Sequence, residues 1–534
     1  MSGDRPAQGD DDANLHRETA PGVREDGTAP YFEPTLACYA GAAKVDTSPP
    51  VGIYTRMWGA ALHDCATAVH RPGYASALAL AESEGAAIRV LLALDACVMA
   101  FDETEEVIAA VMGALNLRER HQIVFTMSHT HASTGILTRG KAVEELPGGD
   151  LVPGYVDDLV AACVKVATMA RDAMEPAWLT TATGSCKLAT NRDTWDATGV
   201  ATAPPGAGTS TQHTVQATQG QWVCGYGADS VQGPADDTLL VARIASRTLG
   251  ERPVAEPDFS GNTIGTGVDT SSHTIAILYN YGCHPTTLGP GNMHISPDFI
   301  GSSREILEET YGGTAIFLQG ASGDTGPMIS YSADPASADR NGRMLGYAAC
   351  SAIESLLPPG TGIQYEGAIV SGATLAGWSE APIETSGAVG VLRSEILAMD
   401  LPLAPQMSID EIQQEYDSAE AATEAARAAE GEDSVAYRDA RAISERWRRA
   451  LGKQKSVNRG DEATHFTAYV TVMQLGQSFF IGMGGEPYQV LQQEVRARCK
   501  GLNVMLATLC NQSTELGYLL VRTAPAADVP TRAF

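Results

Sequence analysis

The chain has 534 residues, of which 44% are hydrophobic and 19% charged, as is ordinary for a soluble globular protein with a large core. Its formal net charge of −28 argues against nucleic acid or an anionic membrane surface as a partner. Ten cysteines are scattered without a CxxC pair, and no stretch approaches the ~20 apolar residues that insert into and span a bilayer. We therefore expect a soluble, cytoplasmic protein.

The N-terminal segment differs from the rest of the chain. It is polar, acidic and nearly free of large apolar side chains, and it lacks the apolar stretch of a signal peptide. We predict a disordered leader over residues 1–30, followed by one large domain over residues 31–534.

Apolar, β-branched runs recur along the chain and end in small or turn-forming residues, a pattern that predicts buried strands. These runs are residues 87–97, 121–127, 274–282, 314–320, 478–485 and 502–511. Helical patterns lie between them at 102–116 and 154–174, and the first opens with Asp102 and Glu105 spaced as in a capping box. Strands that alternate with helices favour an α/β fold, with a central mixed sheet covered by helices.

Two segments depart from this alternation. Residues 196–236 are rich in Gly, Thr, Ser, Gln and Ala and predict a long irregular excursion. Residues 408–452 form a charged, alanine-rich block broken at EGED, which predicts a helical hairpin insertion packed on the domain. Ser408 is the expected cap of its first arm, Gly431 marks the break, and three arginines suit the C-terminus of the second arm: Arg446, Arg448 and Arg449.

Polar or ionisable residues follow five of the predicted strands at their C-terminal ends, the edge at which α/β sheets bind ligands. They are His129 and His131 in SHTHAS, His284 in GCHPTT, Asp324 in SGDTG, Glu486 in GGEP, and Tyr518 after Gly517. Because residues i and i+2 of a strand point to the same face, His129 and His131 can converge on one site.

Two imidazoles from different strands and one carboxylate, here His129, His284 and Glu486, make a serviceable zinc site. Catalytic zinc commonly has three protein ligands of N and O type and keeps a position for water. Tyr518 could coordinate the metal or bind its water, and His131 is free to polarise a carbonyl or move a proton. Each residue also has a purely structural interpretation, since histidines at strand ends are often hydrogen-bonded core residues, Glu486 could be a turn residue and Tyr518 could be core.

Taken together and in order, these motifs resemble the neutral/alkaline ceramidase family, zinc amidases that cleave N-acyl bonds. The matching segments are KVDTSPPVG (44–52), SHTHAS (128–133), TNRD (190–193), GCHPTT (282–287), SPDFIG (296–301), LQGASGDTGP (318–327), GGEP (484–487) and CNQSTELGY (510–518). The resemblance implies a zinc ion bound by His129, His284, Glu486 and Tyr518. It also implies that His131 and Arg192 face the substrate carbonyl and stabilise the oxyanion, a role for which the permanent cation of a guanidinium is well suited.

The chain departs from the family's pattern at three points. Ceramidases carry a serine in a GDVSP motif where this chain has Gly326, so we expect zinc-activated water, with a pKa near about 7, to attack in place of an acyl-serine route. The segment NQSTELGY carries one residue more than expected before its tyrosine, which weakens the assignment of Tyr518. The sequence ends 16 residues after Tyr518, without room for the family's C-terminal β-sandwich domain, so we expect a shortened intracellular relative.

These patterns predict a zinc-dependent hydrolase that cleaves the amide bond of a small molecule. Two long lipid chains need a large apolar pocket, and an aromatic content of 6% offers no obvious wall for one. Two alternatives stay open: the same site could open an ester or lactone, or the chain could be a metal-binding homologue that has lost activity. The acyl group, the amine and the oligomeric state, a homo-oligomer included, are not fixed by the sequence.

Overall fold

The computed structural model describes residues 35–61, 63–196, 200–201, 215–216, 221–224, 234–247, 273–358, 361–370, 372–382, 391–402, 407–457, 464–511 and 518–519. The predicted leader, residues 1–30, lies outside these ranges. Most of the predicted excursion at 196–236 does too. Apart from residues 234–236, the described parts of the excursion belong to two short antiparallel pairs, β10 (Asp193–Asp196) with β13 (Gln221–Cys224) and β11 (Val200–Ala201) with β12 (Val215–Gln216).

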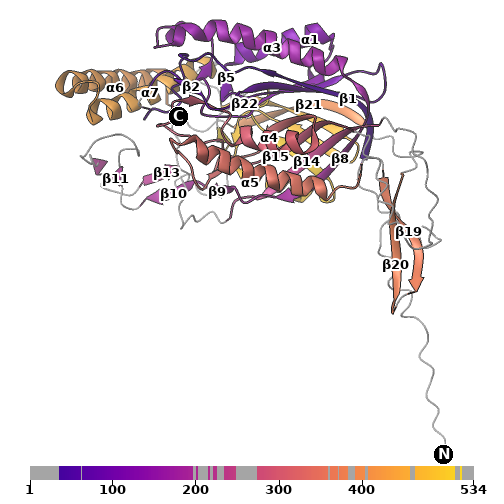
Figure 1. The fold of residues 1–534 in the computed structure, drawn as a ribbon. Coiled ribbons are helices and arrows are strands. Elements are labelled where there is room, and N and C mark those ends of the chain that lie inside the picture. The colour runs from indigo at the N-terminus through magenta and orange to yellow at the C-terminus, as the bar shows by residue number, and fades with distance from the viewer. Residues whose placement is uncertain are drawn as a thin grey trace, which may run out of the picture.

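An eight-stranded sheet forms the centre, in the order β17-β15-β14-β8-β1-β3-β4-β6 (Figure 1). Its strands are β1 (Thr35–Asp46), β3 (Tyr74–Ala81), β4 (Arg89–Leu94), β6 (Ile123–Met127), β8 (Glu175–Ser185), β14 (Thr238–Ser246), β15 (Thr274–Tyr281) and β17 (Thr314–Gln319). The outermost pairs β4–β6 and β15–β17 are parallel, and the pairs between them are antiparallel. The sheet is therefore mixed, which confirms the predicted α/β class.

Four helices cover one face of this sheet: α1 (Phe101–Leu115), α3 (Val152–Asp172), α4 (Phe299–Tyr311) and α5 (Pro335–Glu354) (Figure 1). Ile277 and Tyr279 of β15 face these helices, whereas Ala276 and Leu278 point to the opposite face. Because both faces are buried, the strand shows no polar alternation in sequence.

The start of α1 differs from the prediction. The helix begins at Phe101 with Ala100 as its N-cap and without a side-chain cap, so Asp102 and Glu105 do not form a capping box. Asp102 lies in the first turn, where a negative charge favours the positive end of the helix dipole.

A second sheet covers the opposite face of the large one. Its strands, in the order β21-β22-β23-β25, are β21 (Leu392–Pro402), β22 (His465–Leu475), β23 (Ser478–Gly482) and β25 (Asn503–Ala507). Met473, Phe480 and Met505 share one buried cluster with Leu78 and Leu278 of the large sheet. Helix α8 (Gln489–Arg498) packs on the outer side of this second sheet. The sequence predicted strands at 478–485 and 502–511 but not that they form a separate layer.

The curvature of the large sheet brings its two edges together. In a flat sheet of this order, β6 and β17 would run in opposite directions. Successive strands rotate by about 20–25°, so the seven steps across eight strands accumulate about 140–175° and turn the two edge strands toward a common direction. The segment after β25 joins both edges, because the backbone N–H of Thr508 donates to Gln319 (2.8 Å) and that of Asn511 to Phe125 (2.9 Å). The strand ends on both edges therefore meet at one place.

The predicted helical hairpin is present as α6 (Ile409–Glu430) and α7 (Val435–Val457). The Ser408 hydroxyl accepts from the backbone N–H of Glu411 in a capping box, and Gly431 ends α6 with a φ of 82°. Helix α7 continues to Val457, so the three arginines at 446–449 do not lie at its C-terminus, as predicted, but further back in the helix.

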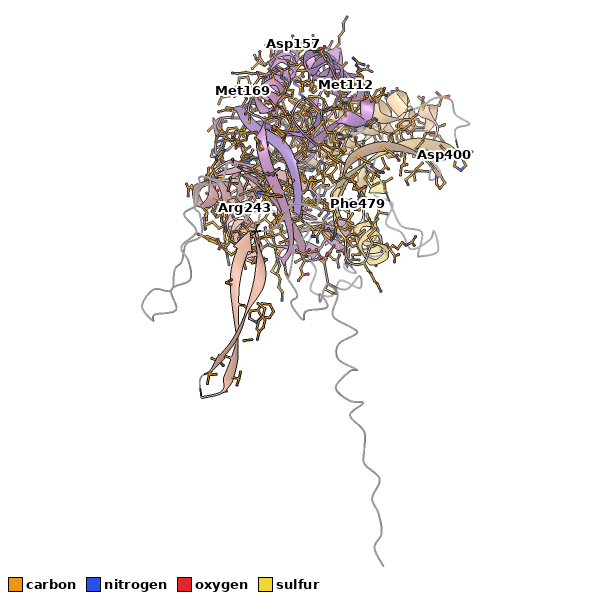
Figure 2. The ribbon with its side chains drawn as sticks, turned by 90° about the vertical axis from the view of Figure 1, so that its right-hand side faces the viewer. Met112, Asp157, Met169, Arg243, Asp400 and Phe479 are labelled. Carbon is orange, nitrogen blue, oxygen red and sulfur yellow. The ribbon has the colours of Figure 1, made fainter. Side chains whose placement is uncertain are left out.

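A two-stranded hairpin, β19 (Thr361–Val370) and β20 (Thr374–Pro382), projects from the body of the molecule (Figure 1). In Figure 2, Met112 on α1 and Met169 on α3 lie at the end of the molecule opposite to this hairpin. The short elements are α2 (Lys141–Glu144), 3₁₀ turns at Arg120–Gln122 and Gly149–Leu151, and the strands β2 (Ala68–Val69), β5 (Val98–Met99), β7 (Ile136–Leu137), β9 (Ala189–Asn191), β16 (His294–Ile295), β18 (Thr325–Pro327), β24 (Glu486–Pro487) and β26 (Tyr518–Leu519). Of the helices in the described part of the chain, none has the length and apolarity to cross a membrane.

Candidate metal centre and active site

Three side chains from distant parts of the sequence meet where the edges of the large sheet join. His129 follows β6, His284 follows β15, and Glu486 begins β24. The Nε2 atom of His129 lies 3.1 Å from Oε2 of Glu486, and Nε2 of His284 lies 3.7 Å from the same oxygen. One ligand atom from each residue falls within 4.8 Å of the other two, which makes this trio a candidate metal site.

The hydrogen bonds of both histidines direct Nε2 toward this centre. Nδ1 of His129 lies 3.0 Å from the carbonyl oxygen of Cys97, and Nδ1 of His284 lies 3.2 Å from that of Ser322. A carbonyl can only accept a hydrogen bond, so Nδ1 carries a proton in each ring, and Nε2 is the nitrogen that faces the centre. This arrangement is the one in which metal-ligating histidines are usually held.

The spacing of the donor atoms fits zinc. With ligand distances of about 2.0–2.1 Å, a tetrahedral zinc ion separates its ligand atoms by about 3.3–3.4 Å. The distances of 3.1 and 3.7 Å from Glu486 to the two histidines bracket this value. Two imidazole nitrogens and one carboxylate also form a donor set that is common at catalytic zinc.

His131 approaches the same centre. Its Nε2 atom lies 3.4 Å from Nε2 of His129 and 3.2 Å from Nε2 of His284. The predicted convergence of His129 and His131 is therefore present, but strand alternation does not cause it, because both residues lie beyond the last residue of β6. His129 instead has a left-handed backbone with a φ of 66°, which is uncommon outside glycine and frequent at functional sites. Its N–H donates to Ala96, which fixes this turn against the end of β4.

The pKa values of the three histidines are strongly perturbed. Burial by itself lowers the pKa of His129, but Cys97 and Glu486 outweigh burial and raise the pKa well above its usual value. Burial lowers the pKa of His131 well below the usual range, and positive charge on His129 and Arg192 lowers it further. The pKa of His284 is likewise far below the usual range because of burial and then of Arg192. His131 is therefore a neutral imidazole at pH 7.

Arg192 lies close enough to His131 and His284 for its charge to lower the pKa of both rings. It follows β9, which pairs antiparallel with β18, and its side chain is only 4% exposed. Its Nη2 donates to the carbonyl of Gly323 at 3.0 Å. A Cβ atom on Gly326, where ceramidases carry serine, would lie 3.4 Å from Cδ of Arg192 and 4.0 Å from Cβ of His284. Gly326 therefore borders the site and supplies no nucleophile there.

Of the other predicted site residues, Tyr518 lies next to Glu486 along the backbone, and Asp324 has a structural contact. β26 pairs parallel with β24, so the backbone of Tyr518 lies opposite Glu486, but the tyrosine side chain lies outside the described residues. Asp324, the fifth strand-end residue, accepts from the backbone N–H of Gln489 at 2.8 Å and thereby fixes the start of α8. This contact matches an ordinary structural role for Asp324.

Sequence reasoning missed two residues at this centre. Cys97 places its Sγ 3.6 Å from Nδ1 of His129 and forms a second candidate group with His129 and His131. Cys97 ends the predicted strand at 87–97, so the strand-end rule could have included it. The Trp58 ring packs against His131 with 5.0 Å between ring centroids, and no motif in the sequence marks this tryptophan.

The fold is shared with two solved structures of ceramidases. A crystal structure of neutral ceramidase from Pseudomonas aeruginosa superposes with a TM-score of 0.55 at 13% identity, over 91% of this chain and 69% of that one. A structure described as a ceramidase complexed with C2 gives a TM-score of 0.55 at 14% identity, over 91% of this chain and 70% of the other. No protein-family model matches the sequence, and neither does any curated protein. At this level of identity the likeness shows that the chain has a ceramidase-like fold.

Proposed function

We propose that this chain is a zinc-dependent hydrolase that cleaves the amide bond of a small molecule in the cytoplasm. One observation carries the proposal: His129, His284 and Glu486 converge with zinc-like spacing, and both histidines have Nδ1 bound to a backbone carbonyl. The site lies in a fold shared with ceramidases, and the motifs that resemble that family of zinc amidases supply its residues. Tyr518, opposite Glu486, is the candidate fourth ligand.

A zinc ion held by these residues supplies Lewis acidity, which polarises a carbonyl oxygen and lowers the pKa of a water molecule to about 7. Arg192 contributes a fixed positive charge where the carbonyl oxygen becomes negative in the tetrahedral transition state. Because Arg192 is buried, its charge is little screened by water, and its Nη2 bond to Gly323 holds it without rearrangement during the reaction.

His131 moves the proton in this proposal. Its Nε2 atom faces the centre and lies 3.2 Å from Nε2 of His284 and 3.4 Å from Nε2 of His129. It accepts the proton of the attacking water and delivers a proton to the leaving nitrogen. Gly326 offers no side chain to attack the carbonyl, which supports water as the nucleophile.

The test compares matched amides and esters. Zinc-loaded wild type is assayed on 4-nitroacetanilide and 4-nitrophenyl acetate, beside a zinc-treated His129→Ala/Glu486→Ala variant that reports background hydrolysis. The proposal predicts amide turnover above that of the variant. Turnover of the ester alone would replace the amidase with an esterase, and full zinc loading without turnover of either substrate would identify an inactive metal-binding homologue.

A further inference from the structure

Residues 55–61 and 63–64, called the wall below, lie over His131. The indole of Trp58 lies against the His131 ring at 5.0 Å between centroids, with 31° between the ring planes. It also meets the Tyr331 ring edge-on, with 5.4 Å between centroids and 87° between the ring planes. Trp58 is half-buried, so part of the indole stays open to whatever lies beside His131.

A small hollow with an enclosed space of about 10 Å³ lies between this wall and the segment at 289–294. His131 lies on its border, and its apolar lining consists of Met57, Trp58, Ala61, Ala132 and Met293. An enclosed space of this size holds about one water molecule, so no buried channel receives a long chain here, and a group beside His131 lies against the open part of Trp58. A flat indole with two thioethers is a surface that favours a short acyl chain or an aromatic ring.

Helix α7 holds this wall through its arginines. Nη1 of Arg449 donates to the carbonyl of Met57 at 2.6 Å, and Nη2 donates to that of Arg56 at 3.2 Å. The residues whose carbonyls accept these two hydrogen bonds, Arg56 and Met57, immediately precede Trp58 in the chain. A lysine could not hold both, because an ammonium group lacks the fixed fork of a guanidinium.

A second set of contacts fixes the other side of the wall. Arg56, which is buried, donates to the carbonyl of Gly59 at 2.6 Å and pairs with Asp64 at 3.3 Å. Arg441 of α7 reaches the same carboxylate at 2.6 Å. Gly59 packs so closely on α7 that an added Cβ would lie 3.2 Å from the carbonyl oxygen of Ala442. Trp58 is therefore tied to the helical hairpin on both sides.

We propose that Trp58 determines which acyl groups fit beside His131, favouring short or aromatic ones, and that Arg449 positions it from the helical hairpin. The proposal rests on the proposed amidase function. It assigns the hairpin insertion a role in substrate selection, with Trp58 as the specificity-determining residue and Arg449 as a positioning residue.

The substrate half is tested with 4-nitroanilides of acetic, butyric, benzoic and octanoic acid. In wild type we expect the first three to react faster than the octanoyl compound. Trp58→Ala should lower kcat/KM for the benzoyl and butyryl compounds about tenfold, mainly through KM, while it raises the relative rate on the octanoyl compound. Trp58→Phe should retain the wild-type preference. An equal loss on all four substrates would overturn the role of Trp58.

The positioning half is tested with Arg449→Lys and with Arg446→Ala, an exposed arginine of the same helix, as matched control. Arg449→Lys should shift the acyl preference as Trp58→Ala does, and it should add no further shift in the Trp58→Ala background. If the shifts in acyl preference of the two single variants add up in the double variant, Arg449 does not act through Trp58.

Hydrogen exchange of the zinc-loaded proteins separates this inference from the proposed function, because it needs no substrate. Amides at 55–64 should exchange faster in Arg449→Lys than in wild type or Arg446→Ala. Equal exchange in all three proteins would show that Arg449 does not hold this segment in place. A wild type that turns over no amide would refute the amidase and the substrate half together, while the exchange result would still decide whether Arg449 holds the wall.

Discussion

Replacing Arg192 by methionine should remove most of the activity, while the protein stays folded. Methionine keeps an apolar chain beside Gly326 and removes the guanidinium that, in our account, faces the developing negative oxygen. Loss of one donor of this kind lowers kcat by about 10²–10³, or about 2.7–4 kcal/mol in the activation barrier. We expect the upper part of this range, because a side chain that is 4% exposed leaves little room for water to replace its charge.

The assay measures kcat and KM of zinc-loaded Arg192→Met on an amide that the wild type hydrolyses. KM should change little, because the lost interaction belongs mainly to the transition state. The carbonyl of Gly323 loses a donor, so unfolding should become easier by about 1–2 kcal/mol, which a thermal melt would register. Arg192→Lys keeps a positive charge and should fall between the wild type and the methionine variant.

Metal analysis of the same preparations is the control, since Arg192 is not a ligand and the variant should hold as much zinc as the wild type. A folded, zinc-loaded Arg192→Met protein whose kcat lies within about threefold of the wild type would refute the reasoning, because that ratio corresponds to less than about 1 kcal/mol.

Three further changes test other parts of the structure. Arg304→Met should destabilise the protein by about 3–5 kcal/mol in urea unfolding, because it leaves Asp95, 2.8 Å away in a buried ion pair, without its partner; a loss below about 1 kcal/mol would contradict a buried pair. Burial raises the pKa of Asp298 to about 6, so the folded state binds this proton more tightly than the unfolded state does. As the pH rises from about 3 to 7, wild-type stability should therefore fall by about 3 kcal/mol relative to Asp298→Asn, and parallel pH curves would contradict this shift. Tyr518→Phe should weaken zinc affinity in a chelator competition if the phenol is a ligand, and unchanged affinity would remove it from the site.

The sequence was informative wherever burial alone decides structure. The apolar runs became β4, β6, β15, β17, β23 and β25 because strands buried on both faces are apolar throughout. The helical hairpin was readable from Ser408 and Gly431, whose roles depend on local backbone geometry. The second sheet was not readable, since the same runs could pack in either layer.

The sequence arguments for the candidate site were only partly physical. The rule that strand ends share one edge holds for parallel sheets, whereas here twist and the segment after β25 bring the ends together. The left-handed turn at His129 depends on contacts with the end of β4, which spacing cannot reveal. Arg192 came only from the family resemblance, and Trp58 from neither source, because its place over His131 depends on α7.

The zinc content of the purified protein tests the central claim most directly. Wild type, the double variant His129→Ala/Glu486→Ala and the control His273→Ala are prepared with zinc and analysed by elemental mass spectrometry. His273 precedes β15, pairs with Glu175 and is 63% exposed, so it reports any nonspecific loss. Our account predicts about one zinc per chain in the wild type and the control, and little or none in the double variant. A wild-type protein that is prepared with zinc and still holds no bound metal would contradict our account.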